Sequence, residues 1–314
     1  MQQFFLRIRW VLFVQNNNPM VHGKRDNKRI WSLYNESLVG RMKDILDLKD
    51  IDNYKHDLRY QNRKKNGRPF ILPDKVIEIL ARIRAVFNAS FRSLESYMRI
   101  FQEILGVPRI SYTSIFRRIR RIKVPEIMNP SSSVAVDSTG FKTTIRGDWM
   151  TNKWSKKRKG WIKLHVSADT ERIMASRISL SAENSHDATQ FSKLITGHEV
   201  RVFADKAYDS RSIFNLLRNN GSEAIIPLRK NFSTLSRASP LRGRTAREIR
   251  KLGEEQWKNI HEYGKRWTVE IYFSGLKRVM GEIIRARRPD YMIQEVGLKV
   301  LYYNMMRENT RTYG

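Results

Sequence analysis

One stretch of the sequence, residues 263–281, combines a carboxylate, a phenol and two basic side chains at regular spacing. It contains no proline and no interior run of β-branched residues, so it is predicted to be a helix. At about 100° per residue, four polar side chains fall on one face of that helix: Tyr263, Arg266, Glu270 and Lys277. An apolar stripe borders this face instead of lying opposite to it. Glu270 would therefore sit at the rim of a packed interface, where a carboxylate is held rigidly beside a bound ligand.

The spacing of these four residues resembles the Y-R-E-K signature of DDE insertion-sequence transposases. Two residues separate Tyr263 from Arg266, three separate Arg266 from Glu270, and six separate Glu270 from Lys277. The resemblance implies that Glu270 is the last acid of a catalytic triad, and that the other three side chains contact DNA phosphate near the cleavage site. It also implies that two aspartates upstream end two buried strands.

Two short apolar segments end in aspartate and are predicted to be these strands. Residues 134–137 (VAVD) end at Asp137, and residues 200–205 (VRVFAD) end at Asp205. A predicted hairpin over 161–180 and a helix lie between them, and a helix and a short strand follow. This order matches an RNase H-like α/β fold with a mixed five-stranded sheet and flanking helices. In that fold the two strands are neighbours, so both aspartates would leave the same edge of the sheet.

Three carboxylates that converge at a sheet edge repel one another and take up protons unless a cation neutralises them. Oxygen donors without histidine or cysteine suit Mg²⁺ or Mn²⁺. Two such ions about 3.5–4 Å apart would activate the attacking oxygen and stabilise the leaving oxygen of a phosphoryl transfer. Taken singly, each aspartate could instead be a turn or cap residue, and Glu270 a solvated charge or the partner of Arg266. Asp209 is expected to cap a helix.

A helical segment precedes the strands. Apolar residues recur at helical spacing over 73–87, 92–105 and 112–122, and Gly106 and Pro108 stop the second helix. The last two helices and their short turn predict a helix-turn-helix whose final helix presents four outward-facing arginines to DNA: Arg117, Arg118, Arg120 and Arg121. The alternative is a small helical bundle whose arginines are only solvated.

These observations divide the chain into three regions. They are a basic N-terminal extension (1–70), a helical DNA-binding domain (71–128) and an RNase H-like DDE domain (134–310) with a basic insertion at 227–262. Within the extension, a helix is expected at 35–48 and an exposed basic loop at 53–69.

The charge balance restricts the partner. The chain has 314 residues, and 60 Lys and Arg against 31 Asp and Glu give a formal charge of +29. Such an excess repels itself unless a polyanion is bound, so nucleic acid is the expected partner. The basic residues are spread over the whole chain, and the apolar residues 4–14 are too few to span a bilayer, which argues against a membrane partner. The absence of cysteine excludes disulfides and zinc fingers and fits a cytoplasmic protein.

The resemblance implies a transposase, associated with the nucleoid, that binds the terminal inverted repeats of an insertion sequence. It would cleave DNA at the element ends and join the 3′-hydroxyls to target DNA as a homodimer. Two other classes stay open at this stage. One is a catalytically inactive, repressor-like DNA-binding protein, and the other is an RNA-binding protein for which the charge alone suffices.

Overall fold

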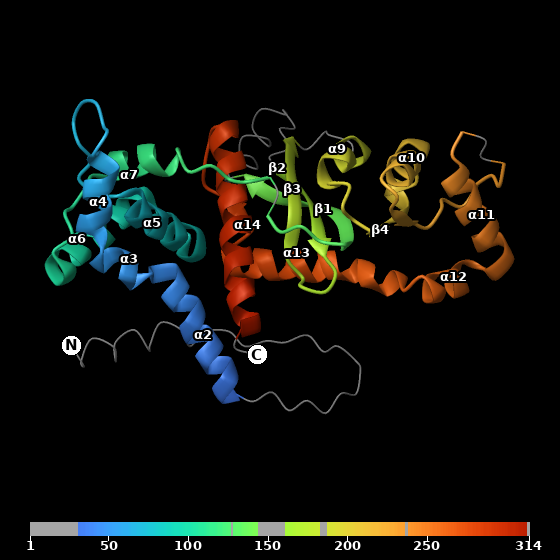
Figure 1. Cartoon of the computed structure of the whole chain (residues 1–314), viewed down its shortest axis with the longest axis horizontal. Coiled ribbons are helices and arrows are strands. Elements are labelled where there is room, and N and C mark those ends of the chain that lie inside the picture. Colours follow the sequence, from blue (N-terminus) through green and yellow to red (C-terminus); the bar gives the residue numbers. More distant parts are fainter. Residues whose placement is uncertain (1–30, 127, 144–160, 183–186, 236–237, 313–314) are drawn as a thin grey trace, which may run out of the picture.

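The computed structural model describes residues 31–126, 128–143, 161–182, 187–235 and 238–312. A group of N-terminal helices and a β-sheet lie on opposite sides of the long C-terminal helix α14 (Pro289–Thr312) (Figure 1). One continuous apolar core runs from the helices through α14 into the sheet. In the part of the chain that the structure describes, no helix is long and apolar enough to cross a membrane.

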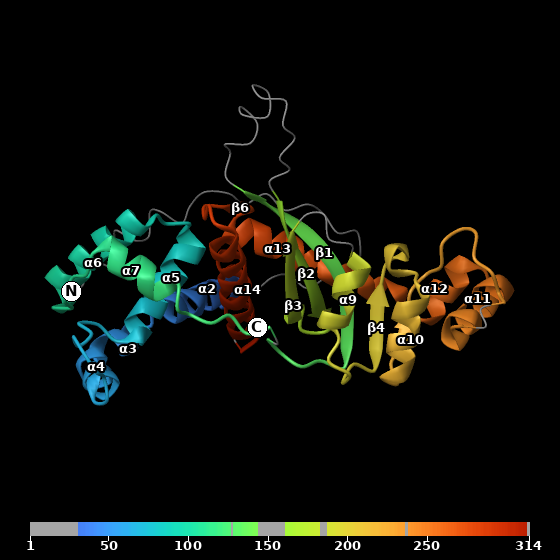
Figure 2. The same cartoon turned by 90° about the horizontal axis from the view of Figure 1, so that it is seen from above.

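The sheet has the order expected of an RNase H-like core. Its strands run β3-β2-β1-β4-β5, and a short β6 pairs with the far end of β1 (Figure 2). β1 is antiparallel to β2 and parallel to β4, so the sheet is mixed. The predicted five-stranded path is confirmed, and β6 is an addition to it. The strands are β1 (Ser133–Thr143), β2 (Trp161–Asp169), β3 (Ala175–Ala182), β4 (Arg201–Ala204), β5 (Glu223–Ile225) and β6 (Ile283–Ile284).

Helices cover both faces of this sheet. α13 and α14 pack on one face, and α9 packs on the other (Figure 2). The expected helix over 263–281 is divided, because Tyr263–Arg266 form a 3₁₀ turn (η2) that precedes α13. The helices that follow β3 are α9 (Asp187–Leu194), α10 (Arg211–Asn219), α11 (Pro240–Leu252), α12 (Glu254–Ile260) and α13 (Trp267–Met280).

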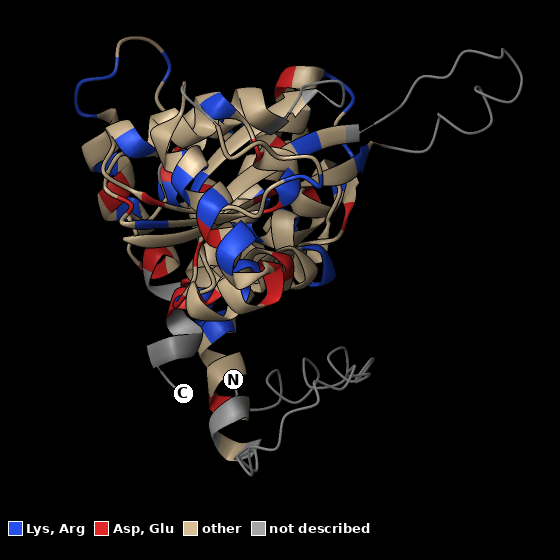
Figure 3. Ribbon diagram, turned by 90° about the vertical axis from the view of Figure 1, so that its right-hand side faces the viewer, with Lys and Arg blue, Asp and Glu red and all other residues tan. Residues whose placement is uncertain are grey.

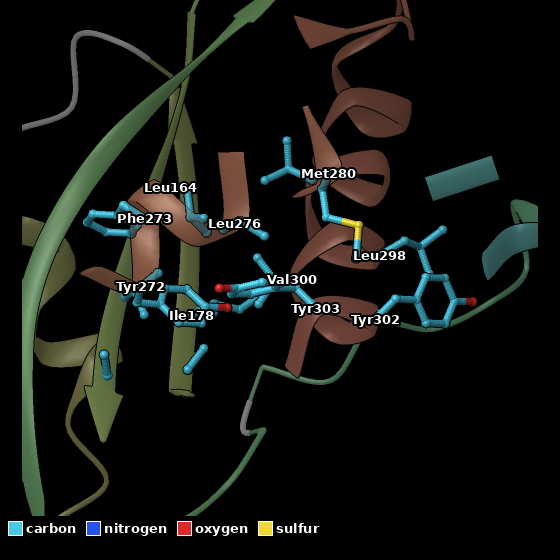
Figure 4. Packing of buried hydrophobic residues seen from close by; sticks show 14 of the residues in the cluster. Leu164, Ile178, Tyr272, Phe273, Leu276, Met280, Leu298, Val300, Tyr302 and Tyr303 are labelled. Carbon is cyan, nitrogen blue, oxygen red and sulfur yellow. The ribbon is translucent and has the colours of Figure 1, made fainter. Parts of the chain in front are cut away.

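α13 is fixed between the sheet and α14. Its apolar side chains, among them Tyr272 and Leu276, lie toward the strands and toward Tyr303 of α14 (Figure 4). A Cβ atom at Gly275 would stand 2.0 Å from the Tyr303 hydroxyl oxygen. Glycine at this position therefore lets the two helices approach, and this packing sets the place of the polar face of α13.

The N-terminal region is more ordered than the sequence suggested. The expected loop over 53–69 is helical in its first half, and Ile51 and Tyr54 join the core because their turns pack against α5. α14 packs against α2 and α5, and α3 and α4 also contact α5, so residues 31–62 are part of the helical body. Its helices are α2 (Trp31–Leu46), α3 (Leu48–Asp52), α4 (Tyr54–Asn62), α5 (Asp74–Phe87), α6 (Phe91–Leu105) and α7 (Tyr112–Ile119).

Candidate active site

Asp137 and Asp205 lie at the same level on two neighbouring parallel strands. Val136 of β1 pairs with Ala204, the last residue of β4, and each aspartate is the next residue along its chain. The expectation that β1 ends at Asp137 is wrong, because β1 continues to Thr143 while it pairs with β2 and β6. Asp137 thus lies at the point where β4, the parallel neighbour of β1, ends and Asp205 follows.

Local hydrogen bonds orient both aspartates. Asp205 caps the 3₁₀ turn η1 (Lys206–Tyr208), and its Oδ1 accepts from the Ala207 amide at 2.8 Å. Asp137 Oδ1 accepts from the Ser138 amide at 2.7 Å. Each bond uses one oxygen of the carboxylate and leaves the other oxygen available. An aspartate can therefore cap a turn here and also take part in the site.

Glu270 comes to these acids from the first turn of α13. Arg266 lies one turn earlier, and its guanidinium spans two of the acids, with Nη2 2.5 Å from Glu270 Oε1 and Nη1 3.8 Å from Asp137 Oδ2. Arg266 is only 14% exposed. The alternative of an ion pair between Arg266 and Glu270 is therefore realised, and the same cation also faces Asp137.

The charges of the three acids act on one another. Burial, helped by the charges of Asp205 and Glu270, raises the pKa of Asp137 to about 6, although the Ser138 amide and Arg266 act to lower it. Arg266 brings Asp137 and Glu270 together, and Asp205 lies at the level of Asp137 on the neighbouring strand. The grouping of the three acids as a catalytic triad stays a prediction.

Tyr263 and Lys277 occupy the two ends of this polar face. The Tyr263 hydroxyl donates to the carbonyl of Ala204 at 3.4 Å, next to Asp205, and burial raises the pKa of Tyr263 to about 12. Tyr263 therefore stays protonated at neutral pH. Lys277 lies farther along α13, 5.8 Å from the Phe141 ring centroid, where burial lowers its pKa. Tyr263 is beside the acids, whereas Lys277 lies toward the far end of β1.

The four arginines around α7 do not share one environment. Arg117, Arg120 and Arg121 are exposed, but the expectation that Arg118 faces outward is wrong. Its guanidinium bonds to Asp74 at 2.6 Å and to the Leu72 carbonyl at 2.5 Å, and the side chain is 10% exposed. The i, i+3 spacing from Ile115 turns Arg118 toward the start of α5.

Residues of the insertion support the site from behind Asp205. Asp209 does not cap α10, because Ser210 does so; its side chain is 1% exposed and pairs with Arg242 of α11 at 2.6 Å. Arg229 donates to the carbonyls of Lys206 and Ala207 in η1. Sequence inspection missed these contacts, and its one signal was the excess of arginine between residues 229 and 250.

The three carboxylates are the type of ligand that a hard divalent ion prefers. In this structure, however, Arg266 lies between Asp137 and Glu270. No group of three His, Cys, Asp or Glu side chains in the described ranges is close enough to hold one metal ion. Arg266 supplies the positive charge that the converging carboxylates require. Carboxylate oxygens without histidine or cysteine suit Mg²⁺ or Mn²⁺.

The mixed sheet carries Asp137 on β1 and Asp205 directly after β4, and α13 carries Glu270. A sequence model of the family described as "Transposase DDE domain" matches residues 129–305, more than half of the chain, and a second model with the same description matches residues 39–146. The chain belongs to the DDE transposase family, which confirms the resemblance seen in the sequence. Members of this family act on DNA and generally use divalent metal ions.

Two individual proteins are similar to this chain, one in sequence and one in structure. The chain is 24% identical over 249 residues to a probable transposase for insertion sequence element ISA1214 of Archaeoglobus fulgidus, across 73% of each protein. It also aligns with a solved piggyBac transposase synaptic complex with hairpin DNA, at 10% identity and a TM-score of 0.38, over 88% of this chain and 79% of that one. The second similarity is too low to carry an argument.

Proposed function

We propose that this protein is the transposase of an insertion sequence, which binds terminal inverted repeats, cleaves DNA at the element ends and joins the 3′-hydroxyls to target DNA. The observation that carries the proposal is that Arg266 bridges Asp137 and Glu270, which come from separate elements, while Asp205 directly follows the strand that pairs with β1 beside Asp137. Family membership supports the same reaction class.

Asp137, Asp205 and Glu270 are the residues that would hold two Mg²⁺ or Mn²⁺ ions. Bound there, the ions would polarise the scissile phosphate, activate the attacking oxygen and stabilise the negative charge on the leaving oxygen. The chain's own contribution is the placement of the carboxylates, since β1, β4 and α13 are held in place by the core. Arg266 would exchange Glu270 for a DNA phosphate when the acids take up cations.

Basic residues around the acids supply contacts for the DNA backbone. Tyr263 in η2 and Lys277 on α13 flank Glu270 along the chain, and α11 adds a row of exposed arginines and a lysine from the insertion. Figure 3, which views the molecule from the α11 end, shows Lys and Arg distributed over several elements. We assign Tyr263, Arg266 and Lys277 to phosphate contacts next to the cleaved bond.

The helices before residue 128 would recognise the terminal repeats. α6 and α7 pack against each other across the turn at residues 106–111, and α7 carries Arg117 on its exposed side with Arg121 just beyond its end. We retain the proposed division into an extension (1–70), a helical DNA-binding domain (71–128) and a DDE domain (134–310). A homodimer would handle two element ends together.

Arg117→Gln combined with Arg121→Gln is expected to lower the slope of log K against log salt for duplex DNA by about 2, since each lost phosphate contact removes about 0.9. Arg118→Ala should instead lower the free energy of unfolding, by about 1–2 kcal/mol, because it removes the bonds to Asp74 and Leu72. Fluorescence anisotropy over a salt series and urea unfolding measure the two effects. An unchanged slope in the double variant would contradict the helix-turn-helix assignment.

The proposed reaction is tested with a labelled element end incubated with Mg²⁺, Mn²⁺ or EDTA. We expect metal-dependent nicking at the end of the element and preference for terminal-repeat DNA over an RNA of equal length. Tight binding without nicking under any metal would favour a catalytically inactive, repressor-like protein. Equal affinity for RNA and for repeat DNA would contradict end recognition.

A further inference from the structure

A cavity whose lining includes none of the three acids lies where the N-terminal helices meet α14. Its volume is about 330 Å³, and its walls come from α5, the start of α6, α7, the loop after β6 and α14. α14 stands beside the N-terminal helices in Figure 1. The cavity is therefore formed jointly by the helical region and the C-terminal end of the chain, and its size is within the range of small-ligand sites.

Aromatic rings form the inner wall of this cavity. The Phe116 ring stands edge-on to Phe91, with centroids 5.2 Å apart, and edge-on to Tyr291, with centroids 5.4 Å apart. The Arg120 guanidinium lies 4.3 Å from the Tyr291 centroid. Flat rings and a planar guanidinium at one place present the surfaces on which a nucleobase stacks.

The same cavity has an excess of positive charge. Its lining carries one carboxylate, Glu295, and five cations: Arg84, Arg120, Arg285, Arg287 and Lys299. Glu295 is already engaged, because it accepts from the amides of Arg285 and Ala286 at 3.0 Å and faces Arg84 at 3.4 Å. Arg120 has Asp290 as a partner at 3.9 Å.

Two of these cations are exposed at the mouth of the cavity. Within the described ranges, neither Arg285 nor Arg287 forms an ion pair with a carboxylate. Burial lowers the pKa of Lys299; Glu295 opposes this effect, and Arg84 and Arg285 add to it. The cations in the wall thus repel one another, and an anion at the mouth would relieve that repulsion.

A ligand that matches both features has a flat aromatic part and a phosphate. We propose that the cavity receives one unpaired nucleotide of DNA, with its base against Phe116 and Tyr291 and its phosphate between Arg285 and Arg287. This site rests on the proposed DNA-binding function and extends it. The end of α7 leads to it, since Arg120 lines the cavity and Arg117 and Arg121 lie on the adjoining exposed surface.

The test uses the full-length protein and two fluorescein-labelled single strands of equal length, an oligodeoxyadenylate and a fully abasic strand. Arg285→Gln combined with Arg287→Gln should weaken binding of both probes about tenfold. Ala286→Trp, which fills the cavity, should weaken binding of the intact probe about tenfold and leave the abasic probe unchanged. Arg211→Gln combined with Arg218→Gln removes the same charge from exposed positions on α10 and serves as the matched control.

Three results would overturn the proposal. The first is that the control variant and the Arg285/Arg287 variant lower the affinity for the probe equally. The second is that Ala286→Trp binds the intact probe as tightly as the wild type does. The third is that free deoxyadenosine monophosphate displaces the probe at the same concentration as an unlabelled competing oligonucleotide. The last result would assign the cavity to a free nucleotide. Because nicking of an element end is measured separately, failure here leaves the proposed reaction standing, and loss of nicking alone leaves the cavity assignment standing.

Discussion

Asp137→Asn, Asp205→Asn and Glu270→Gln are each expected to abolish metal-dependent cleavage of an element end while leaving end binding close to that of the wild type. The loss should be at least about 10³-fold, because removal of one carboxylate forfeits about 4 kcal/mol of charge stabilisation in phosphoryl transfer. The three acids are placed by β1, β4 and α13, whose apolar faces are untouched by these substitutions. The fold should therefore persist.

Nicking rates and end affinities of the three variants can be compared with those of Glu171→Gln. Glu171 is an exposed carboxylate in the turn between β2 and β3, so this control removes the same charge away from the site. Loss of end binding and of cooperative unfolding in all three variants would show that the acids are structural. Full nicking by any one of them would remove that residue from the triad.

Asp137→Asn is expected to stabilise the protein at pH 8 in the presence of EDTA. Burial raises the pKa of Asp137 from 3.8 to about 6 in the folded state. Between these values the folded protein retains a proton that the unfolded chain releases, so wild-type stability falls as the pH rises through this window. The difference of about 2.2 pKa units corresponds to a loss of about 3 kcal/mol that is complete above pH 6 and absent below pH 4.

The free energy of unfolding in urea at pH 4 and at pH 8 measures this effect. The variant and the wild type should be nearly equal at pH 4, and the variant should be more stable at pH 8. Glu171→Gln removes an exposed carboxylate away from the site and serves as the control for the loss of one charge. A variant less stable than the wild type at pH 8 would mean that the Arg266 and Ser138 contacts outweigh burial at Asp137.

The catalytic half of the fold could be predicted from the sequence because its signals are local. Short apolar runs that end in aspartate indicate the buried strands at Val134 and Val202. The spacing of the polar residues from Tyr263 to Lys277 indicates a helix. The order of these elements then fixed which strands are neighbours. The continuation of β1 beyond Asp137 could not be predicted, since it depends on pairing with residues 161–169 and 283–284.

Contacts across long distances in the sequence account for the remaining differences. Arg118 turns inward because its guanidinium bonds to Asp74 at the start of α5 and to the Leu72 carbonyl just before that helix, and nothing near Arg118 in the sequence indicates this. α4 forms within a polar stretch because burial of Tyr54 in the core stabilises the helix. The Asp209–Arg242 pair joins residues 33 positions apart. Propensity alone cannot anticipate tertiary packing of this kind.

The central claim, that Asp137, Asp205 and Glu270 form one metal site for cleavage, is tested most directly by locating Mn²⁺. Crystals of the protein bound to element-end DNA, soaked in Mn²⁺, would be measured at the manganese absorption edge. The account predicts anomalous density in contact with all three carboxylates and Arg266 moved from Glu270 to a DNA phosphate. Density elsewhere, with the Arg266–Glu270 pair intact in a complex that still nicks its DNA, would contradict the account.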